Sequence, residues 1–500
     1  MQLIPLLIIL PLGAAFFISL AGKNRDKLCD IFSIVITFSL FALSLFFVFN
    51  AKNSATPLIY KVGGWGLPGG IILVLDGLSV FMLAVINFIA FIINIFSIDY
   101  MKKFTDKYKF YTLFMLMLGG MNGVVITGDI FNLFVFYEVA SIASYALVAF
   151  GTEKEELEAS MKYTVMGVVG SLFILLGIAF LYAYTSTLNM AEIASLLAQN
   201  GINSAAIFVS VLFLVGFGIK SAIVPFHAWL PDAHPAAPAP ISAMLSGIFI
   251  KSLGVYTLCR IFYNVFGASS TLTHLFMFLG ALSIIVGGVL ALGQSDIKRL
   301  LGYSSISQVG YMILGFGIGS PLAIAGALLH LVNHSVFKSL LFLNAGSLEY
   351  ATGTRNLEQL GGLRTKMPVT SATSLAASMS ISGIPPFAGF FSKLLIIAAC
   401  IKSGYIGYGI IAIIGAIFTI SYILKFQKYT FFGQLKEMNK NIREVPILMR
   451  IPMIILALIC VFGALLILPK AADTFLRPAE ESLSKGTTYA DLASQVSYEK

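Results

Sequence analysis

Long apolar runs separated by short polar connectors recur along the whole chain. Fourteen of them approach the ~20 residues that a transmembrane helix needs. They lie at residues 2–21, 30–50, 76–98, 109–127, 130–150, 160–184, 205–227, 239–265, 272–292, 300–319, 321–348, 368–402, 405–432 and 451–469. The first run is as hydrophobic as a signal peptide but lacks a basic leading segment, so we interpret it as the first span. The pattern predicts an all-α polytopic membrane protein with about fourteen transmembrane helices.

Two of these runs combine a lysine with a backbone break. The seventh carries Lys220 five residues before Pro225, and the Pro-rich connector LPDAHPAAPAP follows. The twelfth contains Pro385 and Pro386 in ISGIPPFAGFF, and then Lys393. Proline removes a backbone donor and interrupts a helix. Counted from the fourth and the ninth run, each broken run is fourth in a set of five, and matching interruptions in two halves point to a transport path.

The basic residues of the connectors predict the orientation in the membrane. Connectors after even-numbered runs hold little beyond Lys52, Lys61 and Lys402. Connectors after odd-numbered runs hold Lys23, Arg25, Lys27, Lys102, Lys103, Lys107, Lys109, Lys298, Arg299, Arg355, Arg364, Lys366, Lys436, Lys440, Arg443 and Arg450. By the positive-inside rule the odd-numbered connectors lie in the cytoplasm, and both termini lie outside.

Composition supports a membrane protein and excludes several other classes. The 500 residues are 58% hydrophobic and only 11% charged, so the net charge of +9 indicates positive-inside bias rather than nucleic-acid binding. The four cysteines lie far apart, and no HExxH occurs, so no metal, disulfide or iron–sulfur framework is predicted. The polar tail 470–500 offers no further span, and no soluble domain is predicted to house a redox centre. We expect no cofactor in this chain.

Glu138 and Lys220 are the first intramembrane pair. A charged lysine at bilayer depth costs roughly 2.5–3.5 kcal/mol or more, so such a residue is a functional candidate by default. Glu138 lies in the fifth run and would pair with Lys220, so that moving a proton elsewhere changes their attraction. The alternatives are a purely structural ion pair, and for Lys220 snorkelling toward an interface. Asp129, at the membrane edge, is expected to cap the fifth helix.

Four further ionisable residues would carry the proton onward. Lys251 follows Ser246 and Gly247 in the eighth run, where snorkelling competes with a transport role. His330, His334 and Lys338 stand at i, i+4 and i+8 and therefore form one stripe along a helix. Histidine relays protons near neutral pH, and a structural hydrogen-bond stripe is the alternative. The two histidines lack an acidic partner on their helix face, which argues against zinc.

Lys393 is the expected far end of the path, where the interrupted backbone would admit water and let groups exchange partners. A purely structural role is the alternative. Asp232 and His234 of the connector are expected to make local turn and lining contacts, and His274, at a helix start, receives no role. Hydration is expected from Ser304, Ser305, Ser307 and Gln308, although such residues also occur at ordinary helix interfaces.

Five ordered motifs resemble one family. They are GDIFNLFVFYEVASIASYALV, IKSAIVPFHAWLPDAHPAAPAPISAMLSG, IKRLLGYSSISQVGYMILG, HSVFKSLLFLNAGSL and SISGIPPFAGFFSK. The chain is similar to the antiporter-like subunits of the respiratory complex I superfamily, which includes NADH-quinone oxidoreductase, Mrp-type antiporter and membrane-bound hydrogenase subunits. Within that family, some motifs look most like the D-type subunit of Mrp antiporters and others like the hydrogenase and complex I versions.

The resemblance implies two inverted five-helix repeats with interrupted seventh and twelfth helices. It divides the chain into N-terminal helices (1–108), a first repeat (109–265), a second repeat (272–432) and a last helix with the tail (433–500). It places the family's functional residues on Glu138, Lys220 and Lys251, on His330 or His334, and on Lys393, where some relatives have glutamate.

These observations favour a proton-translocating subunit of a larger complex in a prokaryotic plasma membrane. Its partners would be other membrane subunits, including related antiporter-like chains. Electron transfer in other subunits of the complex would drive proton translocation. In an Mrp-type Na⁺/H⁺ antiporter, the alternative, inward proton flow would drive sodium outward. A self-sufficient permease would need a central substrate site instead of a row of ionisable residues. A structural quinone-binding subunit would leave the costly buried charges without a purpose.

Overall fold

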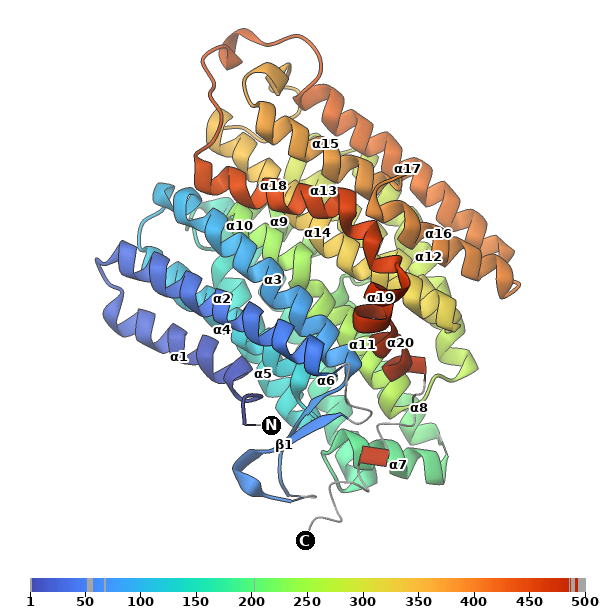
Figure 1. Cartoon of the computed structure of the whole chain (residues 1–500). Helices are drawn as coiled ribbons and strands as arrows, with labels where there is room; N and C mark the ends of the chain where they lie inside the picture. Colours follow the sequence, from blue (N-terminus) through green and yellow to red (C-terminus); the bar gives the residue numbers. More distant parts are fainter. Residues whose placement is uncertain are drawn as a thin grey trace.

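The computed structural model describes residues 2–51, 57–66, 69–201, 203–484, 486 and 491–492. It is a bundle of tilted helices in which chain order broadly follows position (Figure 1). The N-terminal part consists of α1 (Leu6–Ala21), α2 (Asp26–Ala51), the antiparallel hairpin β1 (Leu58–Lys61) and β2 (Ile72–Leu75), and α3 (Gly77–Tyr100). Leu58 lies opposite Leu75 in the hairpin. Met1 and Lys500 lie outside the described residues, so the orientation expected for the termini remains a prediction.

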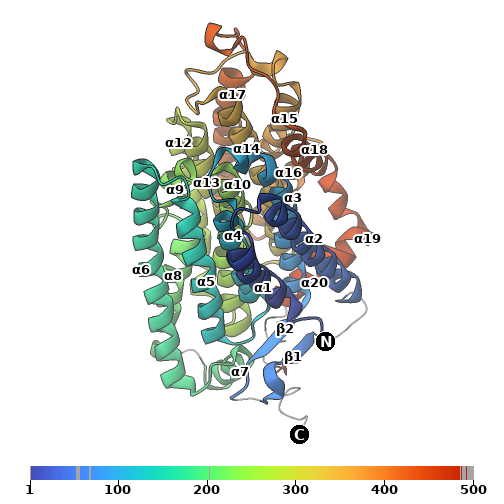
Figure 2. The same ribbon diagram turned by 90° about the vertical axis from the view of Figure 1, so that its left-hand side faces the viewer.

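The next helices cover the expected first repeat. They are α4 (Lys107–Ile126), α5 (Ile130–Val148), α6 (Lys154–Thr185), α7 (Met190–Asn200), α8 (Ser204–Ser221), α9 (Leu230–Ala236), α10 (Ala239–Met244), η3 (Leu245–Tyr256), α11 (Thr257–Cys259) and η4 (Arg260–Val265). η3 and η4 are π-helical and continue α10 and α11 into one long buried helix. In the view of Figure 2, α5, α6 and α8 run side by side.

The remaining helices cover the second repeat and the C-terminal part. They are α12 (Ser270–Leu292), α13 (Ile297–Ile318), α14 (Pro321–Thr352), α15 (Pro368–Ser382), α16 (Ala388–Lys402), α17 (Ile406–Thr430), α18 (Ile447–Phe462), η7 (Gly463–Ile467), α19 (Pro469–Ala471), η8 (Ala472–Leu476) and α20 (Arg477–Ser484). Short 3₁₀ turns also occur at Val62–Gly64, Met101–Lys103, Leu363–Thr365 and Glu437–Asn439.

Each predicted apolar run lies on a helix or on consecutive helices, which confirms an all-α polytopic architecture. Within the described residues, 11 helices are long and apolar enough to cross a membrane. The other expected spans have local reasons for falling below that threshold: α1 is only 16 residues long, and α13 begins with two basic residues and contains a polar serine–glutamine stretch. The twelfth run is split into α15 and α16. The hairpin, α7 and the helices after residue 468 were not predicted.

Aspartates set the start of several helices. Asp76 caps α3 by accepting a hydrogen bond from Ser79 N at 2.8 Å, and Asp296 caps α13 in the same way. Asp129 caps α5 through Asn132 N at 2.7 Å, which confirms the role expected for it. Such caps satisfy backbone donors that a helix start leaves unpaired.

The same turn motif occurs once in each predicted repeat. After α6, the Thr187 hydroxyl accepts from Asn189 N at 3.2 Å, and Asn189 pairs with Asp129 at the start of α5. After α14, the Thr354 hydroxyl accepts from Asn356 N at 3.2 Å, and Asn356 pairs with Asp296 at the start of α13. The first turn lies beside the β-hairpin, and the second lies at the opposite end of the bundle. The same motif at opposite ends is what two inverted repeats would produce.

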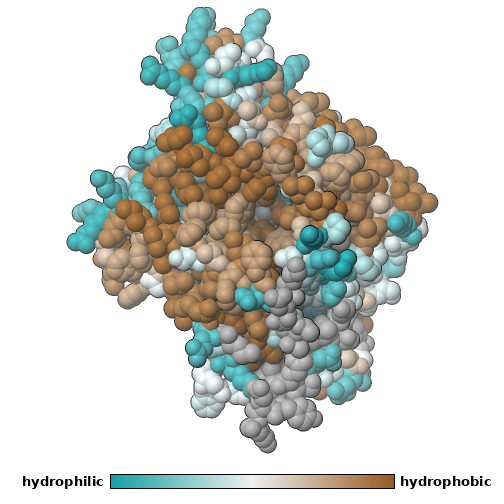
Figure 3. All heavy atoms as spheres, viewed as in Figure 1, coloured by the Kyte–Doolittle hydropathy of each residue, from teal (hydrophilic) through white to brown (hydrophobic). Residues whose placement is uncertain are grey.

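The two ends of the bundle differ in what they carry. The hairpin face carries β1, β2, α7 and α20, and the basic face carries the lysine- and arginine-rich connectors (Figures 1 and 2). Figure 3 shows an apolar belt between them and a polar cap at the top of the molecule. Exposed apolar side chains such as Leu172, Ile413 and Leu458 form part of the lipid-facing surface.

Candidate functional site

The predicted ionisable residues lie inside the bundle. Lys220, Lys251, Lys338 and Lys393 are each no more than 4% exposed, and His330 and His334 are fully buried. Glu138 is partly buried. Snorkelling toward an interface, the alternative for Lys220 and Lys251, is therefore wrong. Each ammonium instead needs polar partners within the protein.

Lys220 lies in the last turn of α8, where the helix ends within the membrane. Ala222 ends it with a left-handed backbone (φ 54°) that returns its N–H to the carbonyls of Gly218 and Ile219. The Lys220 ammonium donates to Ser141 Oγ at 2.9 Å and to the Tyr145 hydroxyl at 3.0 Å, both on α5. Because a helix C-terminus carries partial negative charge, this position favours a cation by about 0.3–1 kcal/mol or more.

Glu138 makes no direct ion pair with Lys220 among the contacts of the described residues. Its carboxylate accepts a hydrogen bond from the Ser171 hydroxyl of α6. Glu138, Ser141 and Tyr145 occupy i, i+3 and i+7 on α5, so two hydroxyls stand next to the carboxylate along the same face. The charge of Glu138 still acts on Lys220 through space. The two members of the predicted pair thus hydrogen-bond to different hydroxyls rather than to each other.

Serines connect the two halves at their junction. Lys251 donates to the Ser246 carbonyl within η3, and the Ser246 hydroxyl lies 2.7 Å from the Ser305 hydroxyl of α13. The neighbouring Ser304 accepts a hydrogen bond from Lys338 of α14, which also donates to Leu301 O at 2.8 Å. Of the serines expected to supply hydration, Ser304 therefore contacts Lys338 directly, and Ser305 contacts Ser246, whose carbonyl accepts from Lys251.

The histidines lie between Lys338 and Lys393. His330 Nδ1 lies 3.0 Å from Ser392 Oγ, one residue before Lys393 on α16. The ring centroids of His330 and His334 are 6.3 Å apart, and both rings experience the charges of Lys251 and Lys393. Both ring nitrogens of His334, and Nε2 of His330, are buried without a hydrogen-bond partner among the described residues. A buried polar atom in that state costs about 1–3 kcal/mol, so it favours a transient partner.

Lys393 repeats the arrangement of Lys220. α15 ends at Ser382, Gly383 takes a left-handed backbone (φ 74°), and α16 begins at Ala388. The Lys393 ammonium donates to Ile381 O at 2.8 Å and lies 4.9 Å from the centre of the Tyr311 ring. Both ammonium groups thus lie at the C-terminal end of a half-helix, next to predicted breaks that the structure confirms around Pro225, Pro385 and Pro386.

Sequence reasoning missed two buried groups beside the row of ionisable residues that runs from Lys220 through Lys251, Lys338 and the two histidines to Lys393. His234 of α9, expected to make only turn and lining contacts, is fully buried, and within the part of the chain that the structure describes both its ring nitrogens lack a hydrogen-bond partner. Its ring lies against Phe342, with centroids 4.5 Å apart. Lys298, assigned to a cytoplasmic connector, is 2% exposed and lies 2.7 Å from Glu349. The PDAHP motif, in which a histidine is enclosed by prolines in an apolar context, was the available signal for His234.

A polar cleft of about 940 Å³ opens on the basic face beside these two groups. The cleft is lined by residues from α6, α9, α13 and the end of α14. Its walls are rich in carboxylates; Asp232 contacts Lys162 at 3.4 Å and Arg299 at 3.2 Å across it. It therefore joins water on the basic face to the neighbourhood of Lys298 and His234.

Comparison with known proteins identifies the family. The model described as "NADH:quinone oxidoreductase/Mrp antiporter, TM" matches residues 127–419, and that of the complex I chain 5 N-terminus matches residues 67–111. The chain belongs to the NADH:quinone oxidoreductase/Mrp antiporter family. This confirms the resemblance to antiporter-like subunits drawn from the five motifs.

Relatives of the antiporter-like chain come from both branches of the family. It is 34% identical to the D-type subunit of the Na⁺/H⁺ antiporter of Alkalihalophilus pseudofirmus over 93% of its length and 94% of that protein. It is 37% identical to the N-type subunit of the NADH-quinone oxidoreductase of Desulforudis audaxviator over 74% of both chains.

Solved structures show the same two branches. A chain of the Mrp complex from Dietzia sp. superposes with a TM-score of 0.91 at 25% identity, covering 98% of this chain and 99% of that one. A chain of the archaeal membrane-bound sulfane sulfur reductase, a respiratory membrane complex, gives a TM-score of 0.88 at 30% identity, covering 98% and 100%. The antiporter-like chain therefore shares its whole fold with subunits of multi-subunit membrane complexes.

Proposed function

We propose that this chain is the proton-translocating subunit of a Na⁺/H⁺ antiporter complex of the Mrp type in a prokaryotic cell membrane. The observation that carries the proposal is the buried row of Lys220, Lys251, Lys338 and Lys393, interleaved with histidines and hydroxyls. Four ammonium-bearing side chains removed from water would be costly in a purely structural bundle. The near full-length similarity to D-type antiporter subunits supports the Mrp assignment over the redox-driven complex favoured from sequence.

Protons enter from the basic face. The carboxylate-rich cleft collects them, and Glu349, Lys298 and His234 lie between the cleft and Lys338. Each step transfers one proton from a donor to a neutral acceptor, either an amine, an imidazole or water. Because imidazole both accepts and donates near neutral pH, the histidines connect lysines that have no direct contact.

The charge state of one group sets that of the next. Removing a proton from the middle of the row weakens the repulsion on the neighbouring lysine and strengthens the hold of Glu138 on Lys220. A proton transfer at one end of the row thereby changes the charge state of the groups at the other end. Partner subunits of the complex at that end would respond to this change in charge. The half-helix ends at Ser221 and Ser382 supply fixed partial negative charge that holds the two outer ammonium groups in place.

A second candidate is a redox-coupled complex, favoured by the relatives of NADH-quinone oxidoreductase and sulfane sulfur reductase type. The same row of residues would move protons in such a complex, and electron transfer in partner subunits would drive the movement. Vesicles holding the whole complex separate the two. Sodium-dependent dissipation of a pH gradient supports the antiporter, whereas proton uptake that starts only on addition of an electron donor and acceptor supports the redox complex.

The row itself is tested by Lys220→Ala in the whole complex. We expect loss of proton movement with assembly retained, because the substitution removes the ammonium but leaves an apolar side chain at the end of α8. Lys425→Ala is the matched control: Lys425 is only partly buried and donates to the carbonyls at the end of α12, away from the row. Wild-type rates in the Lys220 variant would refute the proposal.

A further inference from the structure

A second buried polar cluster lies on the hairpin-face side of the row. Asp76 and Arg260 form a bidentate ion pair, with the Nη1 and Nη2 atoms of the guanidinium 2.6 and 2.7 Å from the two carboxylate oxygens. Arg260 is 1% exposed and Asp76 8%. No part of the proposed row uses this pair, and the sequence reasoning passed over Arg260 although it lies in the same long apolar run as Lys251.

The cluster is a continuous hydrogen-bonded set. Arg260 donates from Nε to the Tyr256 hydroxyl at 3.1 Å and from Nη2 to the Ser79 hydroxyl at 3.1 Å, and the two hydroxyls lie 3.4 Å apart. Both hydroxyls donate to the Val125 carbonyl, at 2.6 and 2.9 Å. At the other end, Arg260 Nη1 donates to Asn264 Oδ1 at 3.0 Å. Hydroxyl, carboxylate, guanidinium and amide groups therefore follow one another without a gap.

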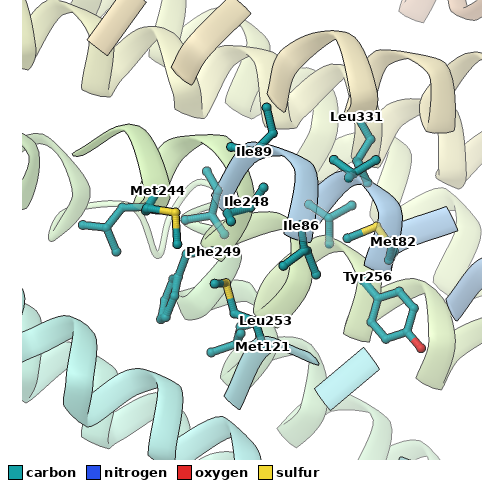
Figure 4. Packing of buried hydrophobic residues seen from close by; sticks show 14 of the residues in the cluster. Met82, Ile86, Ile89, Met121, Met244, Ile248, Phe249, Leu253, Tyr256 and Leu331 are labelled. Atoms are coloured by element: carbon teal, nitrogen blue, oxygen red, sulfur yellow. The ribbon is translucent and has the colours of Figure 1, made fainter. Parts of the chain in front are cut away.

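One helix connects this cluster to the row. Lys251 precedes Tyr256 by five residues within the π-helical η3, so the two side chains are one π-helical turn apart. Tyr256, Arg260 and Asn264 then follow at i, i+4 and i+8 and share one face. Figure 4 shows Tyr256 at the edge of an apolar cluster that includes Met82, Ile86 and Leu253, with its hydroxyl directed away from them.

The stripe ends at a cavity on the hairpin face. This cavity, of about 580 Å³, is lined by Asn264 together with residues of α7, the end of η4 and the C-terminal segment. α20 closes its inner side: Asn264 Nδ2 donates to Ser482 O at 2.7 Å, and the Pro478 backbone packs on Gly77 so closely that a side chain there would overlap it. Asn264 thus stands between the cavity and the buried ion pair.

We propose that Tyr256, Arg260, Asp76 and Asn264 form the gate through which protons pass between Lys251 and the hairpin-face cavity. The inference rests on the proposed function. A proton leaving the Lys251 ammonium, which faces the Ser246 carbonyl, reaches the Tyr256 oxygen through water. The Tyr256 and Ser79 hydroxyls turn from the Val125 carbonyl as the phenol releases its own proton through Ser79 to the Asp76 carboxylate. Asp76, now neutral, loosens its hold on Arg260 and passes the proton to water in the cavity. Arg260 stays charged throughout and repels other cations while the gate is closed.

The first test is accessibility. In vesicles with the hairpin face exposed, Asn264→Cys in the whole complex is treated with the thiol reagent MTSEA. We expect labelling and, with it, a fall in proton transport of at least about tenfold, because the added ammonium lies beside the gate. Gln199→Cys, exposed on α7 outside the cavity, is the control that should label without effect. None of the four native cysteines lines this cavity, as Asn264 does, so the unmodified complex should not respond.

The second test does not depend on the folding of the cysteine variant. Tyr256→Phe removes only a hydroxyl, and we expect at least about a tenfold loss of transport. Tyr111→Phe removes an equally buried hydroxyl, which donates to Asp30 at 2.7 Å among the N-terminal helices, and should leave transport unchanged.

The gate is overturned if Asn264→Cys stays unlabelled, if it labels without loss of transport, or if Tyr256→Phe transports at the wild-type rate. These outcomes leave the row untouched when Lys220→Ala still abolishes transport. If Lys220→Ala is itself harmless, the proposed function fails first.

Discussion

Gly389 offers the sharpest structural test of the second broken helix. It lies in the first turn of α16, and a methyl group added to it would overlap the Ser380 carbonyl of α15. The Ser380 carbonyl oxygen belongs to the backbone, so a change of side-chain rotamer cannot relieve the overlap with the added methyl group. In Gly389→Ala the two half-helices must separate by about 1 Å or more, since a carbon–oxygen contact needs roughly 3.3 Å.

This separation also displaces Lys393, a member of the ionisable row, because Lys393 follows Gly389 by one helical turn. Its bond to Ile381 O is 2.8 Å long, and a shift of about 1 Å takes it beyond hydrogen-bonding distance. A hydrogen bond to a charged group contributes about 1.5–3 kcal/mol, and overpacking costs a further ~1–3 kcal/mol of stability. If the whole energy of the lost hydrogen bond is added to the activation free energy of transport, the transport rate falls by about ten- to a hundredfold.

The assay is pH-gradient dissipation in vesicles containing the assembled complex, with assembly and thermal stability measured in parallel. Gly407→Ala is the matched control, because open space surrounds Gly407 in the same half of the chain. Its transport and stability should match the unmodified complex. Gly389→Ala with normal transport and full assembly would show that the position of Lys393 against α15 does not matter.

Two further predictions concern buried lysines. Tyr145→Phe combined with Ser141→Ala removes both hydroxyls that the Lys220 ammonium contacts, so transport should fall further than with either single change. A double variant with wild-type rates would show that these two contacts do not matter for transport. Glu349→Gln should lower thermal stability more than Lys298→Met, because the first leaves a lysine that is 2% exposed without its carboxylate, whereas the second leaves a glutamate that is 27% exposed. Equal losses would contradict this difference in burial.

The sequence was most informative where burial conflicts with residue type. Lysines and prolines within apolar runs predicted the two broken helices, and they predicted buried ionisable residues whose transport role stays a proposal, because a charge in hydrocarbon has few explanations other than function. The periodic apolar runs likewise predicted the helices, since their lengths match the bilayer.

What the sequence could not supply depended on long-range packing. Glu138 and Lys220 lie on neighbouring helices, yet the ammonium contacts hydroxyls of α5 instead of the carboxylate, and residue spacing does not reveal which side chain reaches the ammonium. Lys298 was read as a connector charge because helix ends are indistinct in sequence, although its side chain turns into the bundle. Arg260 was overlooked because its partner, Asp76, lies 184 positions away.

The central claim is that one hydrated path links the buried groups from Glu138 to Lys393. A high-resolution electron cryo-microscopy map of the complex in lipid tests it most directly. We expect ordered water between Lys220 and Lys251, at the unpartnered nitrogens of His334, and between His330 and Lys393. Dry apolar side chains filling those three intervals would contradict the account, since protons would then have no means of crossing them.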